Sequence, residues 1–212
     1  MYPKININLD LIGKNASYIK EELKNIGADI FFVSKLLMGD IKVAKVIVDS
    51  GINYIADSRI KNIIKMKNNG IVAEYVMLRI PALSEIEEVV KNTEMSLVSE
   101  IKTVEAINRE AAKNNKVYKI IYMIDLGDLR EGVWYEKAIS EILSVKNFKN
   151  TELVGIGTNL GCFGGILPDE KNLGMLSEFA LELKEEGFGI KFVSGGTTAV
   201  LKMVEEKRNI GK

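Results

Sequence analysis

Lys35 is the residue of this sequence whose type and position best suit covalent chemistry. It follows a mostly apolar run at residues 28–34 and precedes three further apolar residues. We expect its side chain to lie across the mouth of a site formed by strand ends, where partial desolvation favours the neutral amine. A neutral amine is a nucleophile that can form a Schiff base. The alternative is a lysine that reaches outward or pairs with a carboxylate such as Asp57.

A second segment has the composition of an anion-binding loop. Residues 194–200 read SGGTTAV, which places two glycines after an apolar run and two hydroxyl residues where a helix would begin. Such a loop offers close backbone approach, N–H groups and hydroxyl donors to a phosphate. The alternative is an ordinary strand–turn–helix with a threonine cap. The candidate residues are Ser194, Gly195, Gly196, Thr197 and Thr198.

A lysine at one strand end and a phosphate seat at another predict pyridoxal 5'-phosphate. This cofactor needs both an amine for its aldehyde and a site for its phosphate.

Two glycine-containing loops add further candidates. In residues 124–134 (IDLGDLREGVW), Arg130 could orient an anionic oxygen, or it could simply pair with Asp125. Residues 155–168 do not match G-x-G-x-x-G, because Leu160 stands where the third glycine belongs, so we reject a dinucleotide-binding loop. We expect this glycine-rich segment to fold over a ligand. Cys162 within it has no histidine to activate it and is expected to be structural.

Composition excludes several classes of function. The 212 residues contain no histidine and one cysteine, which removes histidine-based nucleophile systems and histidine-ligated zinc, and we expect no metal site. Lys plus Arg and Asp plus Glu both number 29, so no net charge favours nucleic acid or a membrane surface. No apolar stretch is long enough to span a bilayer. These features predict a cytoplasmic protein that binds neither nucleic acid nor membrane.

The elements that must position these residues alternate along the chain. After a helix predicted at 10–26, short apolar runs typical of buried parallel strands alternate with helical patterns. The predicted strands are residues 28–34, 54–57, 74–79, 95–99, 117–125, 152–158 and 190–194. The predicted helices include residues 40–50, 84–91, 100–114, 135–145, 168–186 and 197–206. Asp10, Asp40, Ser58 and Ser84 are predicted N-caps, and Gly51, Gly70 and Gly187 are predicted to end helices.

This order predicts an α/β fold with a parallel sheet. An open doubly wound sheet is one possibility, but about seven strand–helix units favour a (β/α)8 barrel that is one strand short. We see no linker, and expect one cofactor-binding domain over residues 1–212, incomplete at its C-terminus as a piece of a longer chain.

Six motifs together resemble the alanine/ornithine racemase group of pyridoxal-phosphate enzymes, whose N-terminal domain is a (β/α)8 barrel. They are VSKLLMGD, DSRI, LRIP, MIDLGDLREGVW, GIGTNLGCFGG and VSGGTT, and they extend over essentially the whole chain. IDLGDLREG also parallels the VDTGM-x-RLG loop of bacterial alanine racemases.

The resemblance implies a role for each candidate. Lys35 would carry the Schiff base with the cofactor and return a proton to one face of the substrate Cα. Arg130 would hydrogen-bond the phenolic oxygen of the cofactor. Asn159 falls where alanine racemases place a histidine beside the pyridine ring, and residues 194–198 would bind the phosphate.

Departures from the family pattern are equally specific. Gly39 stands where alanine racemases have a phosphate-binding tyrosine, and Met123 replaces the lysine that becomes carbamylated beside the arginine. The eighth-strand arginine, and the tyrosine base from a neighbouring subunit's C-terminal domain, would both lie beyond Lys212. The resemblance therefore implies a homodimeric full-length parent, and leaves the activity of this chain alone in question.

The expected function is amino-acid racemisation, with ornithine favoured as substrate and alanine second. Asp57, Glu100 and Asp128 are strand-end acids that could hold a basic side chain. The first alternative is a non-catalytic pyridoxal-phosphate carrier or homeostasis protein, which shares this barrel. The second is an aldolase-type lyase that uses the lysine without a cofactor.

Overall fold

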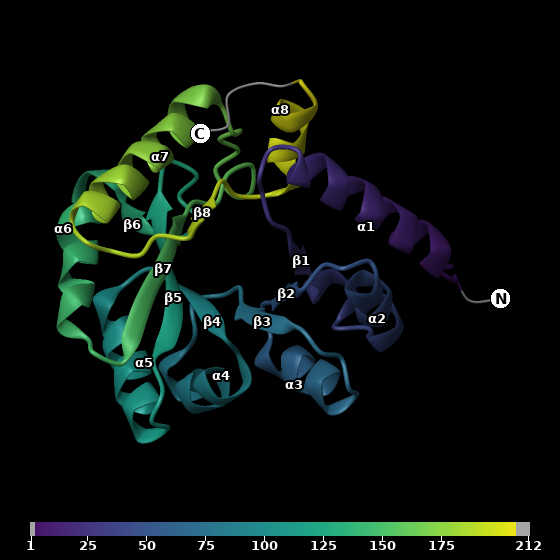
Figure 1. Ribbon diagram of the computed structural model, residues 1–212, viewed down its shortest axis with the longest axis horizontal. Coiled ribbons are helices and arrows are strands. Elements are labelled where there is room, and N and C mark those ends of the chain that lie inside the picture. Colours follow the sequence, from purple (N-terminus) through teal and green to yellow (C-terminus); the bar gives the residue numbers. More distant parts are fainter. Residues whose placement is uncertain (1–2, 207–212) are drawn as a thin grey trace. The chain divides into compact units, whose positions relative to one another are not determined.

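The computed structural model describes residues 3–206 (Figure 1). The chain divides into two compact units, Met1–Leu78 and Arg79–Lys212. The expectation of one domain stays a prediction. No helix in the described part of the chain is both long and apolar enough to cross a membrane.

The first unit contains three parallel strands and three helices. Its elements in chain order are α1 (Leu9–Lys24), β1 (Phe31–Val33), the 3-10 turn η1 (Lys35–Leu37), α2 (Ile41–Asp49), β2 (Tyr54–Asp57), α3 (Ile60–Asn68) and β3 (Glu74–Met77). β2 pairs with β1 and with β3. The register sets Val33 opposite Ala56 and Asp57 opposite Met77, so the carboxyl ends of these strands lie at one edge.

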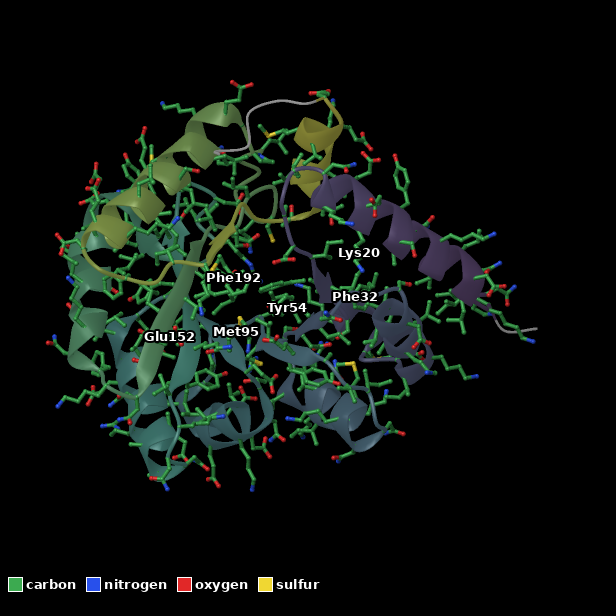
Figure 2. The ribbon with its side chains drawn as sticks, in the orientation of Figure 1. Lys20, Phe32, Tyr54, Met95, Glu152 and Phe192 are labelled. Carbon is green, nitrogen blue, oxygen red and sulfur yellow. The ribbon has the colours of Figure 1, made fainter. Side chains whose placement is uncertain are left out.

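Apolar contacts between α1 and α2 build the core beneath β1. Ala16 of α1 packs with Val43 and Ile47 of α2 and with Ile52, and Phe32 of β1 packs against this cluster. Lys20 of α1 donates to the carbonyl oxygen of Ser50 at the end of α2 (3.5 Å), and Figure 2 labels Lys20, Phe32 and Tyr54 in this region. The helices therefore support β1 from one side and fix where its carboxyl end lies.

The second unit alternates strands with helices along the rest of the chain. Its elements are η2 (Leu83–Glu85), α4 (Ile86–Asn92), β4 (Met95–Val98), α5 (Ile101–Lys113), β5 (Tyr118–Asp125), β6 (Val133–Trp134), η3 (Tyr135–Lys137), α6 (Ala138–Leu143), η4 (Ser144–Asn147), β7 (Thr151–Gly157), α7 (Glu170–Glu185), β8 (Phe192–Ser194), η5 (Thr198–Val200) and α8 (Leu201–Glu205). β5 pairs with β4 and β7, and β7 pairs with β8, all parallel.

Two glycines of β7 let β8 approach closely. A Cβ on Gly155 would lie 2.5 Å from the carbonyl oxygen of Phe192, and one on Gly157 would lie 3.0 Å from the Cβ of Ser194. Figure 2 labels Glu152 on β7 and Phe192 on β8. The glycines therefore fix the position of the strand that leads into residues 194–198.

The seven predicted parallel strands are all present among the described residues. The prediction misses β6, whose two residues extend the parallel pairing of β5. β1 is shorter than predicted and is not buried on both faces, because Val33 is 38% exposed and β1 pairs only with β2 within its unit. Residues 207–212, at the C-terminal end of the predicted domain, lie outside the described residues.

Helix starts are less well predicted than strands. Asp40 caps α2 as expected, and Gly51, Gly70 and Gly187 have positive φ. The predictions that Asp10, Ser58 and Ser84 are N-caps are wrong. Asn8 caps α1, and Ser84 lies inside η2. Arg59 rather than Ser58 is the N-cap residue of α3, and it makes no side-chain capping bond.

Candidate functional site

Lys35 opens a tight turn at the end of β1. The 3-10 turn η1 begins at Lys35, and the N–H groups of Leu37 and Gly39 both donate to the carbonyl oxygen of Ser34. Met38 and Gly39 have φ values of 51° and 59°, so the chain reverses through two left-handed residues before α2. The turn places Lys35 at the carboxyl edge of the strands, as predicted for a site residue.

The side chain of Lys35 is exposed, which corrects the expectation of a desolvated amine. The strand ends at Val33, and Lys35 belongs to a turn that leaves the sheet. The alternative of a Lys35–Asp57 ion pair is also not found among the described residues, because other donors bind Asp57.

Asp57 is a buried carboxylate that ties this turn to the next strand. Its Oδ2 accepts from the hydroxyl of Ser34 (2.6 Å), and its Oδ1 accepts from the backbone N–H of Arg59 (2.9 Å) and the side-chain amide of Asn62 (3.0 Å). From the sequence, Asp57 was a candidate acid for binding a basic substrate. Its bonds instead fix Ser34, the residue before Lys35.

The position of Asn62 explains the departure at Gly39. A Cβ on Gly39 would lie 3.0 Å from the Cβ of Asn62 and 3.2 Å from its carbonyl oxygen. The positive φ of Gly39 also disfavours other residues. A tyrosine cannot occupy this position without moving α3.

In the second unit, the loop after β5 winds around Asp125. The Asp125 carboxylate accepts from the N–H groups of Gly127 (2.8 Å) and Leu129 (3.1 Å). A Cβ on Gly132 would lie 2.5 Å from the backbone nitrogen of Asp125, so only glycine permits this return. Arg130 is exposed on the loop, and the Asp125–Arg130 ion pair considered from the sequence is absent from the described residues.

Asp128 fastens the glycine-rich segment to the same loop. It is 1% exposed, and its carboxylate accepts from the N–H groups of Phe163 (2.8 Å) and Ile166 (3.2 Å). Burial alone raises its pKa, but hydrogen bonds from the backbone of Phe163, Cys162, Ile166 and Gly164 together lower the pKa below the ordinary value. Asp128 was considered as a substrate-binding acid, but its bonds organise this loop.

Asn159 lies beside the Arg130 loop, held by a residue that sequence analysis missed. Its side-chain amide donates to Oε1 of Glu131 (3.0 Å). Twenty-eight residues separate the two, and only the parallel alignment of β5 and β7 brings them together. The signal for Glu131 was present in the sequence, because it occupies the leucine position of the R-L-G motif that alanine racemases carry.

Residues 194–198 form a turn with free donors next to Asn159. Thr158 donates its N–H to the carbonyl of Ser194 (3.0 Å), and Thr197 donates its hydroxyl to the carbonyl of Leu160 (3.1 Å). Gly196 has φ 106°, and the N–H groups of Gly195 and Gly196 reach no acceptor within residues 3–206. Thr197 also caps η5 by accepting from Ala199. The donor set therefore suits an anion, although Thr197 also performs the capping role considered as the alternative.

Arg130, Asn159 and residues 194–198 thus gather in the second unit, whereas Lys35 lies in the first. Their roles toward a cofactor stay predictions.

A family model decides where the chain belongs. The model described as "Alanine racemase, N-terminal domain" matches residues 7–209. The chain belongs to this family. The resemblance and the fold expected from the motifs are therefore confirmed: the fold is α/β, of the barrel type of that domain, with seven of its strands present.

Members with assigned activities include two racemases of basic amino acids. The lysine racemase of Thermotoga maritima is 41% identical over 209 residues, which cover 97% of this chain and 57% of the relative. The ornithine racemase of Acetoanaerobium sticklandii is 36% identical over 208 residues, 97% of this chain and 58% of the relative. The chain thus spans somewhat more than half of these relatives.

A solved structure from the same fold is close to this chain in extent. PipY of Synechococcus elongatus, solved with pyridoxal phosphate bound, has a TM-score of 0.78 and 13% identity, and the match covers 92% of this chain and 93% of PipY. At this identity, the likeness concerns the fold alone.

Proposed function

We propose that this chain is the cofactor-binding domain of a pyridoxal-phosphate-dependent amino-acid racemase. The observation that carries the proposal is the turn after β1, which presents Lys35 at the carboxyl edge of parallel strands in a chain of the alanine racemase N-terminal family. An exposed amine on a rigid turn is accessible to a cofactor aldehyde.

The donors of the second unit fit the cofactor's phosphate and ring. The N–H groups of Gly195 and Gly196 and the hydroxyl of Thr198 would bind the phosphate. The hydroxyl of Thr158 is buried without a hydrogen-bond partner among the described residues, so an acceptor or donor from a ligand would satisfy it. Arg130 would donate to the phenolic oxygen, and Asn159 would lie beside the pyridine ring.

When bound, pyridoxal phosphate supplies the electron sink that makes an amino acid's α-proton removable. Lys35 would hold the cofactor and then move a proton to or from one face of the substrate Cα. Inversion also requires a second acid–base group on the opposite face.

The substrate class that we propose is a basic amino acid, ornithine or lysine, with alanine second. The names of the two relatives support this choice, since both act on amino acids that end in an ammonium group.

Reductive trapping tests the assignment of Lys35. The protein is incubated with pyridoxal phosphate, reduced with borohydride, and digested for mass spectrometry, with K35A as the matched variant. We expect one modified peptide, labelled at Lys35, and none in K35A. A label on another lysine, with Lys35 unmodified, would overturn the assignment.

A cofactor carrier is the second candidate. The observation that favours it is PipY, which has almost the extent of this chain and holds pyridoxal phosphate. Deuterium exchange at Cα distinguishes the two. A racemase exchanges the α-proton of ornithine or lysine with solvent, and a carrier binds the cofactor without exchange.

A further inference from the structure

We propose that Glu131 selects basic amino acids by accepting a hydrogen bond from the ammonium group at the end of the substrate's side chain. This inference rests on the proposed racemase function and assigns its substrate specificity to one residue.

The other acids near the strand ends are already engaged. Asp57 accepts from three donors and is fully buried, and Asp125 and Asp128 each bind backbone N–H groups of their loops. Glu141 accepts from the hydroxyl of Tyr122, and the exposed Glu100 accepts from Thr103 of the helix that it caps. None of these carboxylates combines a fixed position with free acceptor capacity.

Glu131 combines a fixed position with free acceptor capacity. It is half-buried, and within residues 3–206 the only bond recorded for its carboxylate is the one that Oε1 accepts from Asn159. Asn159 is a neutral donor, so this bond does not pair the carboxylate with a positive charge. Oε2 remains available to a cation, and an ion pair in a half-buried position is stronger than one in open water.

The loop fixes where this charge lies. The two bonds to Asp125 and the close approach of Gly132 to the Asp125 backbone hold the chain on either side of Glu131. Glu131 also lies between the two residues proposed to contact the cofactor, adjacent to Arg130 in sequence and bonded to Asn159. A leucine at this position, as in the R-L-G motif, offers no acceptor for an ammonium group.

The test compares E131Q with the unaltered full-length protein on ornithine, lysine and alanine. Glutamine keeps the shape of the side chain and an oxygen for Asn159, so the fold and the orientation of Asn159 are retained. We expect KM for ornithine and lysine to rise about 10–100-fold with little change in kcat, because losing a hydrogen bond to a charged group weakens binding by about this factor. KM for alanine should change less than about twofold. The matched control is E136Q, an exposed glutamate of η3.

Equilibrium titration of the cofactor-loaded protein, followed by cofactor absorbance, provides a readout independent of turnover. E131Q should raise the dissociation constant of ornithine by the same factor by which it raises KM. Equal losses for alanine and ornithine would mean that Glu131 acts only by positioning Asn159, and unchanged ornithine binding would also overturn the inference. If the unaltered protein binds the cofactor but does not prefer basic amino acids, the proposed substrate class itself fails.

Discussion

Asp57, a buried carboxylate at the end of β2, holds the residue before Lys35 in place without contacting Lys35 itself. Asp57 accepts hydrogen bonds from Ser34, from the N–H of Arg59 just before α3, and from Asn62, so one side chain joins the end of β1 to the start of α3. Sequence reasoning identified Lys35 because its neighbours in the chain are apolar. It could not assign Asp57, since nothing local shows which donors a strand-end acid meets.

D57N should therefore lower the free energy of unfolding by about 2–3 kcal/mol, because it removes charge-assisted hydrogen bonds from a buried position. Urea denaturation at neutral pH measures the loss. The control is D49N, an exposed aspartate that pairs with Lys45 on α2, with an expected loss below about 0.5 kcal/mol. Equal losses in the two variants would contradict the assigned role of Asp57.

The lowered pKa of Asp128 predicts that the stability difference between the unaltered protein and D128N depends on pH. Its pKa is lowered in the folded protein, so its charged form contributes stability above the ordinary carboxyl pKa of about 3.9. That contribution is lost as the pH falls through the folded-state pKa. The melting temperature of the unaltered protein should exceed that of D128N between about pH 5 and pH 7. The gap should narrow below about pH 4, and a gap that widens on acidification would contradict the network.

At the level of elements, the sequence predicted the existence of the strands better than their first and last residues. Residues 54–57 match β2, because an apolar run flanked by polar residues defines a buried strand locally. β1 was predicted to begin at residue 28, but begins at Phe31, where pairing with β2 starts. The bond between Glu131 and Asn159 was not predictable, since it depends on the alignment of two loops that follow different strands.

The close packing of β7 against β8 predicts that two glycine-to-alanine substitutions change the stability of the protein in opposite directions. G155A should destabilise the protein by about 1–3 kcal/mol, because its Cβ would meet the Phe192 backbone at 2.5 Å. G174A lies in α7 with nothing within 4 Å of an added Cβ, and should stabilise by about 0.5–1 kcal/mol. Thermal melting of both variants checks the pair, and similar shifts in the same direction would be inconsistent with the described contact.

For the molecule as a whole, the family match extends over nearly all of this chain but little more than half of its racemase relatives. Sequence motifs were sufficient to assign the family because they lie at the ends of six strands, where the residues of the proposed site are placed. They were insufficient for substrate, because ornithine, lysine and alanine differ only in the side chain that the site must accommodate.

Cofactor binding should stabilise the folded chain. A ligand at 100 times its dissociation constant adds about 2.7 kcal/mol if it binds only the folded state. Pyridoxal phosphate should therefore raise the melting temperature of the unaltered protein, and raise it less for K35M. Without cofactor the two should melt alike, because Lys35 is exposed. An equal rise in both would show that Lys35 contributes nothing to binding.

The contact between Gly39 and Asn62 also constrains any redesign of this chain. Because the Cβ and the carbonyl oxygen of Asn62 lie 3.0 and 3.2 Å from where a Cβ at position 39 would stand, any side chain there requires α3 to shift. A library randomised at residue 39 alone should return glycine among its stable members. An attempt to graft the alanine racemase tyrosine would have to rebuild the first turn of α3 at the same time.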